Sequence, residues 1–326
     1  MHITEARTIA KASPRCDFIQ TSSSSCAGHG PFVSFYLRTS SCTGEDMTGR
    51  RLAVVEQGVD CHAHVFCGER FPFAEKTIYR PHPAQAGTAP EFLAVLDAHG
   101  LTHGLIVGAN PYGTDNRCML DAIANSNGRL KGIALVTHDI TEREIADLSA
   151  RGVVGCRINL YNQGLAPLTD PRAPRLLARL REASWWVQIQ CEGDQLAEVA
   201  PVLEEAEVKI MVDHFGRPDI ARGVSQPGFQ ALLGFGRSGN AVVKLSGPFR
   251  SSREPYPHRD VDPFIEAALA AFTLENCVWG SDWPFVRLDA RVDYGPTLAC
   301  LMRWLPNAAD RRKVLWETPA RLFGFA

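Results

Sequence analysis

The chain has 326 residues, of which 45% are hydrophobic and 21% are charged, and its formal net charge at pH 7 is −2. These proportions are ordinary for a globular protein, and the near-neutral charge gives no indication of a nucleic acid partner. No apolar run in the sequence approaches the roughly 20 residues that a membrane-spanning helix needs. The N-terminus lacks the apolar segment of a secretory signal, so we expect a cytoplasmic protein without a nucleic acid or membrane partner.

The ten cysteines indicate buried thiols rather than a structural metal site. No Cys-x-x-Cys pair occurs in the sequence, which argues against a structural zinc site. Four cysteines lie inside apolar runs, where a reduced thiol behaves as a small hydrophobic group: Cys61, Cys156, Cys191 and Cys277. This usage is typical of a reducing compartment.

Residues 1–50 differ in composition from the rest of the chain. They contain a Thr-Ser-Ser-Ser-Ser run at 21–25, three cysteines, and scattered glycine and proline. We interpret them as a poorly ordered N-terminal extension, with the alternative that translation starts at Met47. Residues 51–326 are predicted to form the folded domain.

Eight short apolar runs alternate with segments of helical periodicity. The runs predict strands over Val59–Val65, Thr102–Gly108, Lys131–Val136, Val154–Leu160, Trp186–Cys191, Lys209–Phe215, Ala241–Gly247 and Cys277–Trp283. Helices are predicted over Glu91–His99, Asn116–Ser126, Glu142–Arg151, Arg172–Ala183, Gln195–Glu204, Phe229–Phe235 and Pro263–Phe272, followed by Gly295–Trp304 and Arg311–Phe323. Eight such units favour an α/β fold, a closed (β/α)8 barrel of the TIM type with extra C-terminal helices. The alternative, a doubly wound open sheet, usually has fewer strands and often a Gly-x-Gly-x-x-Gly turn, which does not follow the first run.

The first predicted strand has two different faces, because side chains alternate along a strand. Val59 and Cys61 lie on an apolar face that is expected to pack under helices. Asp60, His62 and His64 lie on the other face, which we expect to point into the barrel. Two histidines at this spacing converge on one small volume, as two imidazoles that share a metal ion or a substrate oxygen must do.

Polar side chains share faces on other predicted strands as well. They are Arg157 and Asn159 on the fourth strand, Gln188, Gln190 and Glu192 on the fifth, and Lys244 and Ser246 on the seventh. His214 ends the sixth predicted strand and Asp282 ends the eighth. Barrel enzymes keep their chemistry at the carboxyl ends of the strands. The candidate catalytic residues are therefore His62, His64, His214 and Asp282.

Each of these four residues also has a purely structural interpretation. A single histidine at a strand end is more often a hydrogen-bonded structural residue, and Asp282, between two tryptophans, could cap a helix or form a turn. Four such groups at the same end of three strands favour a functional site over four unrelated structural roles.

The segments that carry these residues resemble those of the amidohydrolase superfamily, and in particular its 2-pyrone-4,6-dicarboxylate lactonase group. In chain order they are Val59–Phe66, Gly113–Asn116, Arg157–Asn159, Val212–Asp219 and Trp279–Pro284. The resemblance extends from about residue 58 to the C-terminus. It implies a distorted (β/α)8 barrel that hydrolyses a lactone or a similar ester.

The resemblance also implies roles for individual residues. Asp282 takes the position of the general base, and the three histidines line the site. Substrate contacts are implied for Tyr79 and, through substrate carboxylates, for three arginines: Arg157, Arg217 and Arg250. Asn110 and Gln190 stand at substrate-facing positions where the lactonase group has other residues, a tyrosine in the case of Gln190. An arginine that the group has after the strand-four motif is also missing, because residues 161–164 read Tyr-Asn-Gln-Gly, so one carboxylate clamp is expected to be weaker.

The metal content follows from the same resemblance. Many amidohydrolases hold one or two divalent ions, but a two-metal site needs a lysine on strand four, and Val154–Leu160 contains none. A one-metal site normally adds a histidine on strand five, where Gln190 stands. The lactonase group works without a metal, so we expect no cofactor. In the alternative, one zinc ion is held by His62, His64, His214 and Asp282.

The predicted function is hydrolysis of a carboxylated lactone or a sugar-acid lactone, in aromatic or sugar acid catabolism. Asp282 would accept a proton from the attacking water, and the imidazoles, or a metal that they hold, would polarise the carbonyl. Two alternatives stay open. One is a metal-dependent decarboxylase of an aromatic or muconate-like acid, against which the missing strand-five histidine argues. The other is a non-catalytic barrel that binds a small acid.

Overall fold

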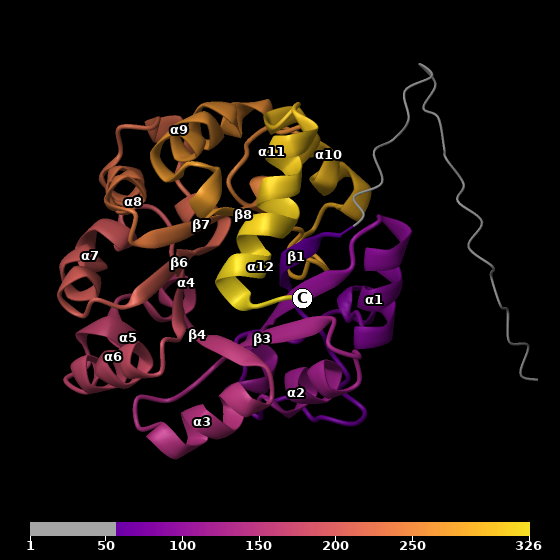
Figure 1. Cartoon of the computed structure of the whole chain (residues 1–326), viewed down its shortest axis with the longest axis vertical. Coiled ribbons are helices and arrows are strands. Elements are labelled where there is room, and N and C mark those ends of the chain that lie inside the picture. Colours follow the sequence, from indigo (N-terminus) through magenta and orange to yellow (C-terminus); the bar gives the residue numbers. More distant parts are fainter. Residues whose placement is uncertain (1–56) are drawn as a thin grey trace, which may run out of the picture. The chain divides into compact units, whose positions relative to one another are not determined.

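The computed structural model describes residues 57–326, in which eight parallel strands follow one another around a barrel in chain order (Figure 1). The strands are β1 (Val59–Ala63), β2 (His103–Val107), β3 (Leu130–Ala134), β4 (Val153–Asn159), β5 (Trp186–Gln190), β6 (Lys209–Val212), β7 (Ala241–Ser246) and β8 (Cys277–Gly280). The predicted (β/α)8 barrel is therefore confirmed. The predicted extension over residues 1–50 and the alternative start at Met47 lie outside the described residues and stay predictions.

Helices surround the strands, as Figure 1 shows. They are α1 (Ala89–Ala98), α2 (Arg117–Ala124), α3 (Glu142–Ala150), α4 (Leu160–Gln163), α5 (Ala166–Thr169), α6 (Ala173–Glu182), α7 (Gln195–Glu205), α8 (Pro227–Ser238) and α9 (Asp262–Phe272), followed by α10 (Tyr294–Trp304), α11 (Ala308–Arg312) and α12 (Thr318–Phe323). The last predicted helix is thus divided into α11 and α12, joined by a π-helical turn over Lys313–Glu317. No helix within residues 57–326 combines the length and the apolar character needed to cross a membrane.

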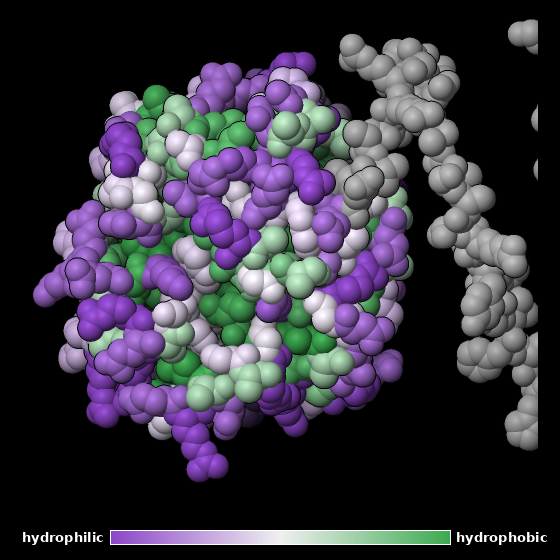
Figure 2. All heavy atoms as spheres, in the orientation of Figure 1, coloured by the Kyte–Doolittle hydropathy of each residue, from purple (hydrophilic) through white to green (hydrophobic). Residues whose placement is uncertain are grey.

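Two apolar clusters stabilise the barrel, because burial of apolar area is the main favourable term in folding. The larger cluster joins the outer faces of the strands to the helices, for example through Phe92 and Leu96 of α1. The smaller one fills the barrel interior and includes Met211, Val242 and the C-terminal Phe323. Helix α12 crosses this end of the barrel (Figure 1), and the same face carries hydrophilic side chains interspersed with hydrophobic areas (Figure 2). With this end filled, the site lies at the other end.

The first strand departs from the predicted alternation. The register of β1 against β2 shifts at a bulge after Asp60. Val59 and Cys61 consequently belong to the interior cluster instead of packing under the helices. The Asp60 side chain accepts a hydrogen bond from Tyr294 of α10 instead of facing the site. The predicted faces were therefore wrong for these three β1 residues.

Two strands end earlier than predicted where the chain approaches the site. Strand β6 ends at Val212 and β8 at Gly280, before the predicted ends at 215 and 283. His214, with φ 50°, and Asp282, with φ 66°, lie two residues beyond the strands in left-handed backbone. The prediction that they end the strands was wrong, because the chain turns out of the sheet before it reaches them.

The barrel closes between β1 and the segment that follows β8. The backbone N–H of Asp282 donates to the carbonyl of His62, and that of His64 donates to the carbonyl of Trp283, each at 2.8 Å. The two chains come so close that a Cβ on Gly280 would lie 2.6 Å from the Cβ of His62. Only glycine permits this approach.

The buried carboxylate of Asp60 stabilises the same contact between β1 and the segment after β8, which we call the seam. Its carboxylate accepts hydrogen bonds from the N–H of His62 at 3.0 Å, from the N–H and hydroxyl of Ser281 at 2.9 and 2.5 Å, and from the Tyr294 hydroxyl at 2.9 Å. Burial raises the pKa of Asp60 to about 6, although these hydrogen bonds oppose the shift. One carboxylate therefore joins β1, the end of β8 and α10.

We expect Asp60→Ala to lower the free energy of unfolding by about 3 kcal/mol or more, because several buried donors lose their acceptor at once. Tyr294→Phe removes one of these bonds and should cost about 1 kcal/mol. Urea denaturation of the two variants beside the wild type measures both effects. An Asp60→Ala variant within 1 kcal/mol of the wild type would contradict the role given to the carboxylate.

Candidate active site

A cavity of about 190 Å³ lies at the carboxyl ends of the strands. Nine of the ten predicted site residues line it: His64, Tyr79, Asn110, Arg157, Gln190, His214, Arg217, Arg250 and Asp282. The tenth, His62, is fully buried beneath the cavity, where its ring lies 4.6 Å from that of His214. The tertiary structure thus brings the predicted residues together.

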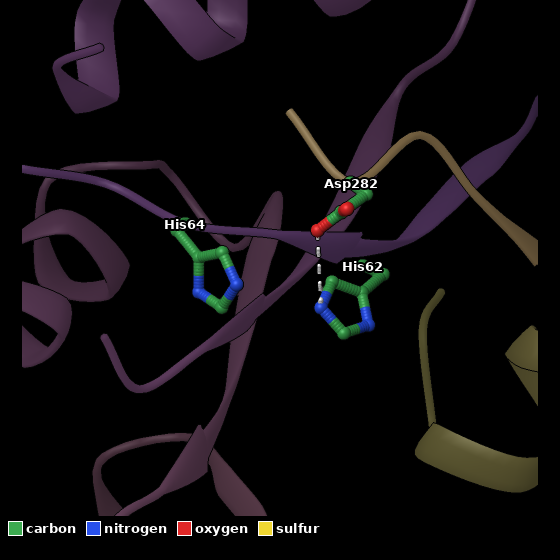
Figure 3. Close-up of side chains that lie close together, drawn as sticks. All are labelled: His62, His64 and Asp282. Atoms are coloured by element: carbon green, nitrogen blue, oxygen red, sulfur yellow. Dashed lines mark ion pairs between the residues drawn. The ribbon is translucent and has the colours of Figure 1, made fainter. Parts of the chain in front are cut away.

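Asp282 and the two histidines of the first strand segment lie close together, as Figure 3 shows. The Nε2 atom of His62 lies 3.6 Å from Oδ1 of Asp282. The rings of His62 and His64 have their centroids 5.2 Å apart and are nearly perpendicular, at 87°. All three side chains are buried.

The backbone determines which nitrogen of His64 carries the proton. Nδ1 lies 2.8 Å from the carbonyl oxygen of Val107, which can only accept a hydrogen bond. Nδ1 is therefore protonated, and Nε2 presents a lone pair. Burial lowers the pKa of His64 to about 4, so the imidazole is neutral at pH 7. Its free nitrogen can accept a proton or bind a cation.

A buried carboxylate and a buried ammonium both lie beside Nδ1 of His62. Nδ1 lies 3.2 Å from Oδ1 of Asp213 and 3.3 Å from the ammonium of Lys244, which can only donate. Burial acts to raise the pKa of Asp213, but Lys244 and the neighbouring imidazoles outweigh it and hold the pKa well below its usual value. When Nδ1 of His62 carries a proton directed at Asp213, Nε2 is unprotonated, and when Nδ1 accepts from Lys244, Nε2 carries the proton. No hydrogen-bond partner among the described residues reaches Nε2.

His214 differs from the other two histidines because its partner is a hydroxyl. Its Nδ1 lies 2.8 Å from Oγ of Ser246, which can donate or accept. When Ser246 donates, Nε2 of His214 carries the proton and becomes a hydrogen-bond donor. The fit is tight, since a Cβ on Gly247, whose φ is 56°, would lie 2.8 Å from Nδ1 of His214.

Asp213 is the site residue that the sequence reasoning missed. Strand alternation puts Asp213 and His214 on opposite faces, but both contact His62 in the interior. The left-handed backbone at His214 breaks the alternation. A signal was present in the inward-facing Gln188 and Lys244: the amide of Gln188 donates to Asp213 at 2.8 Å and accepts from Lys244 at 2.7 Å. Such a buried cation needs a carboxylate partner.

Guanidinium groups hold the upper part of the site. Arg250 donates from Nε to Oδ2 of Asp282 at 2.7 Å. Burial alone would raise the pKa of Asp282, but Arg250 and the imidazoles outweigh it and hold the pKa well below its usual value. Arg157 donates to the side-chain oxygen of Gln190. Gln190, predicted only as a substrate contact, therefore also positions Arg157.

The phenol of Tyr79 stays protonated, since burial raises its pKa to about 12. It can therefore donate a hydrogen bond to a bound molecule. The cavity also has walls that sequence reasoning did not predict: Tyr161, Asn162, Phe249, Val286, Arg287 and Leu288. Residues 161 and 162 were noted in the sequence only because an arginine of the lactonase group is missing there. No motif marks residues 286–288.

The donor set next to Asp282 fits one divalent cation. Ligand atoms of His62, His64 and Asp282 lie within 4.8 Å of one another, and the unpartnered Nε2 of His62 is the kind of buried atom that an ion would satisfy. His62, Asp213 and His214 form a second such group, but the Lys244 ammonium already contacts two of its members. The predicted set of His62, His64, His214 and Asp282 is divided between these two groups, with His214 in the second, and it stays a prediction.

The comparisons with known proteins agree with this arrangement. The sequence model of the amidohydrolase family matches residues 59–325. This chain belongs to the amidohydrolase family.

Similar family members include two curated enzymes. The chain is 34% identical over 277 residues to the 4-sulfomuconolactone hydrolase of Rhizobium radiobacter, a match over 83% of this chain and 91% of that protein. It is 31% identical over 276 residues to the 2-pyrone-4,6-dicarboxylate hydrolase of Comamonas testosteroni, over 81% and 89%. The crystal structure of a probable 2-pyrone-4,6-dicarboxylic acid hydrolase from Acinetobacter baumannii, with citric acid bound, superimposes with a TM-score of 0.75 at 31% identity and covers 82% of this chain and 99% of that one.

The histidines predict the acid limb of the pH profile. Burial lowers the pKa of both His64 and His214 to about 4, so they become protonated only as the pH falls through that value. For a lactone whose own charge is constant, kcat/KM should be flat from about pH 5 to 8 and should fall below about pH 5. Initial rates across this range test the expectation, which an acid limb centred near the ordinary histidine pKa of 6.5 would contradict.

Proposed function

We propose that this protein is a lactone hydrolase in which Asp282 activates the attacking water. The observation that carries the proposal is an ionised Asp282 at the base of a cavity lined by arginines, with Nε2 of His62 3.6 Å from its Oδ1 and with His64 beside it. A carboxylate beside the unprotonated Nε2 of His64 suits a water that must lose a proton. The named reactions of the relatives, hydrolysis of 4-sulfomuconolactone and of 2-pyrone-4,6-dicarboxylate, support the same chemistry.

The two oxygens of Asp282 have different tasks in this mechanism. Arg250 binds Oδ2 at 2.7 Å, which leaves Oδ1 to accept a proton from the water. The second water proton points to an imidazole lone pair, so the water oxygen is oriented toward the carbonyl carbon. The new C–O bond forms as the proton moves to Asp282.

The carbonyl oxygen becomes an oxyanion and needs donors. His214 supplies one from Nε2 when Ser246 donates to its Nδ1, and the cavity-lining guanidinium of Arg157 supplies charge. When the tetrahedral intermediate collapses, the bond between the acyl carbon and the ring oxygen breaks. Asp282 returns its proton to that oxygen, and the product is the ring-opened hydroxy acid or its enol form.

The substrate that fits this cavity is a carboxylated lactone. Among the described residues that line the cavity, Asp282 carries the one carboxyl group, whereas four residues are arginines. Tyr79, Asn110 and Arg217 are placed to contact a bound acid, and Arg250 can share its guanidinium between Asp282 and a substrate carboxylate. The expected partner is a small-molecule lactone.

We also propose that hydrolysis does not require a metal. An ion held by His62, His64 and Asp282 would supply Lewis acidity and lower the pKa of water. The oxyanion, however, already has two partners among the side chains: the Nε2 proton of His214, when Ser246 donates to its Nδ1, and the guanidinium of Arg157. These two groups supply the stabilisation that the reaction needs.

Replacing Asp282 by asparagine should lower kcat by a factor of about 10² to 10⁴, the usual contribution of a general base. The test is a panel of lactones with a pH-indicator readout. Asp289→Asn is the matched control, since Asp289 lies exposed in the same loop, and this substitution should leave the activity unchanged. An Asp282→Asn variant with more than a tenth of wild-type activity would overturn the base assignment. A wild type that hydrolyses no lactone, yet binds acids as well as the variant does, would support the non-catalytic alternative.

Removal of metal ions with a chelator should change the rate of lactone hydrolysis by less than about twofold, because the cations that the mechanism uses are side chains. The measurement is hydrolysis before and after dialysis against a chelator, together with the metal content of the protein. Loss of activity that zinc restores would show that the metal-independent proposal is wrong. Analysis of the same reactions for carbon dioxide tests the decarboxylase alternative.

A further inference from the structure

Arg287 is a cavity residue whose charge has no obvious structural task. It lies in the loop after β8, is exposed, and lines the cavity. Among the described residues its guanidinium makes no ion pair, and its polar contact is a hydrogen bond of 3.2 Å to the side-chain oxygen of Asn162.

The aromatic neighbours of Arg287 hold it over the cavity. Its guanidinium carbon lies 5.4 Å from the ring centre of Tyr79 and 5.6 Å from that of Tyr161. A second guanidinium, that of Arg217, lies 4.0 Å from the same Tyr161 ring. Contacts of this kind orient a guanidinium without neutralising it.

The positively charged guanidinium groups of Arg217 and Arg287 therefore both lie beside the ring of Tyr161, and little negative charge offsets them. The acid near Arg217 is Glu192, whose carboxylate is 3.9 Å away and half exposed, so solvent screens the pair. The Nε atom of Arg217 is buried and has no hydrogen-bond partner. A buried unpartnered donor beside an unpaired cation is the arrangement that an anionic group satisfies.

We propose that Arg287, with Arg217, forms an outer subsite that binds a second anionic group of the substrate, away from the carbonyl that reacts. The inference rests on the proposed lactone hydrolysis and makes Arg287 a specificity-determining residue. It also offers a replacement for the arginine that residues 161–164 lack: Asn162, within that segment, accepts a hydrogen bond from an arginine supplied by a different loop. A carboxylate and a sulfonate present the same chemistry to this subsite.

The test compares substrates and variants together. Hydrolysis of 2-pyrone-4,6-dicarboxylate and of its two monocarboxylates is measured for the wild type and for Arg287→Met. We expect the variant to lose about tenfold or more in kcat/KM for the dicarboxylate, mainly through KM, and to change by less than about twofold for the monocarboxylate that lacks the outer group. Asn162→Ala, which releases Arg287 but keeps its charge, should shift the same ratio by a smaller factor.

The matched control is Arg291→Met, because Arg291 lies in the same loop, is 86% exposed, and pairs with Asp293. It should leave every ratio unchanged. An unchanged ratio of dicarboxylate to monocarboxylate activity in Arg287→Met would overturn the proposal, and so would an equal loss for all substrates.

Citrate binding, measured by calorimetry, separates this proposal from the hydrolase assignment. If the wild type hydrolyses none of the pyrones, the hydrolase proposal fails for that substrate class, while weaker citrate binding by Arg287→Met, but not by Arg291→Met, would still support the anion subsite. Equal citrate affinity in all three proteins, together with an unchanged ratio of dicarboxylate to monocarboxylate activity, would contradict the proposed anion subsite.

Discussion

The site depends on the close approach of β1 to the chain that follows β8. Gly280 allows it, and Asp60 fastens it with hydrogen bonds to Ser281 and Tyr294. Because the backbones of His62 and Asp282 are bonded to each other at 2.8 Å, the base and the imidazoles are placed by the seam itself. Flexible side chains alone would not hold three buried groups around one point.

Charge is arranged in layers above that seam. At depth, Lys244 offsets Asp213, and both lie beside Nδ1 of His62. One level higher, Arg250 offsets Asp282 and leaves one of its oxygens available. Burying a charge is costly unless it is paired, and here the carboxylates of Asp213 and Asp282 each have a cation beside them. Burial keeps the imidazoles neutral, so they take part in hydrogen bonds and do not act as fixed charges.

At the mouth of the cavity arginines outnumber carboxylates, so positive charge is not offset there as it is deeper in the site. Arg217 and Arg287 are held by Tyr161 and Asn162, and little else offsets their charge. In the mechanism that we propose, the base of the cavity prepares a water, whereas the mouth binds an anion. This division separates the residues that perform the reaction from those that select the substrate.

The sequence by itself determined the barrel and most of the site, because strand periodicity and the His-x-His pair depend only on local order. It could not determine the bulge that turns Asp60 outward, nor the left-handed backbone that brings Asp213 inward beside His214, since both break the alternation on which the prediction depends. The role of Arg287 also needed the tertiary structure. Its neighbours Tyr79 and Asn162 lie more than a hundred residues away in the chain, and only the closed barrel brings them to one cavity.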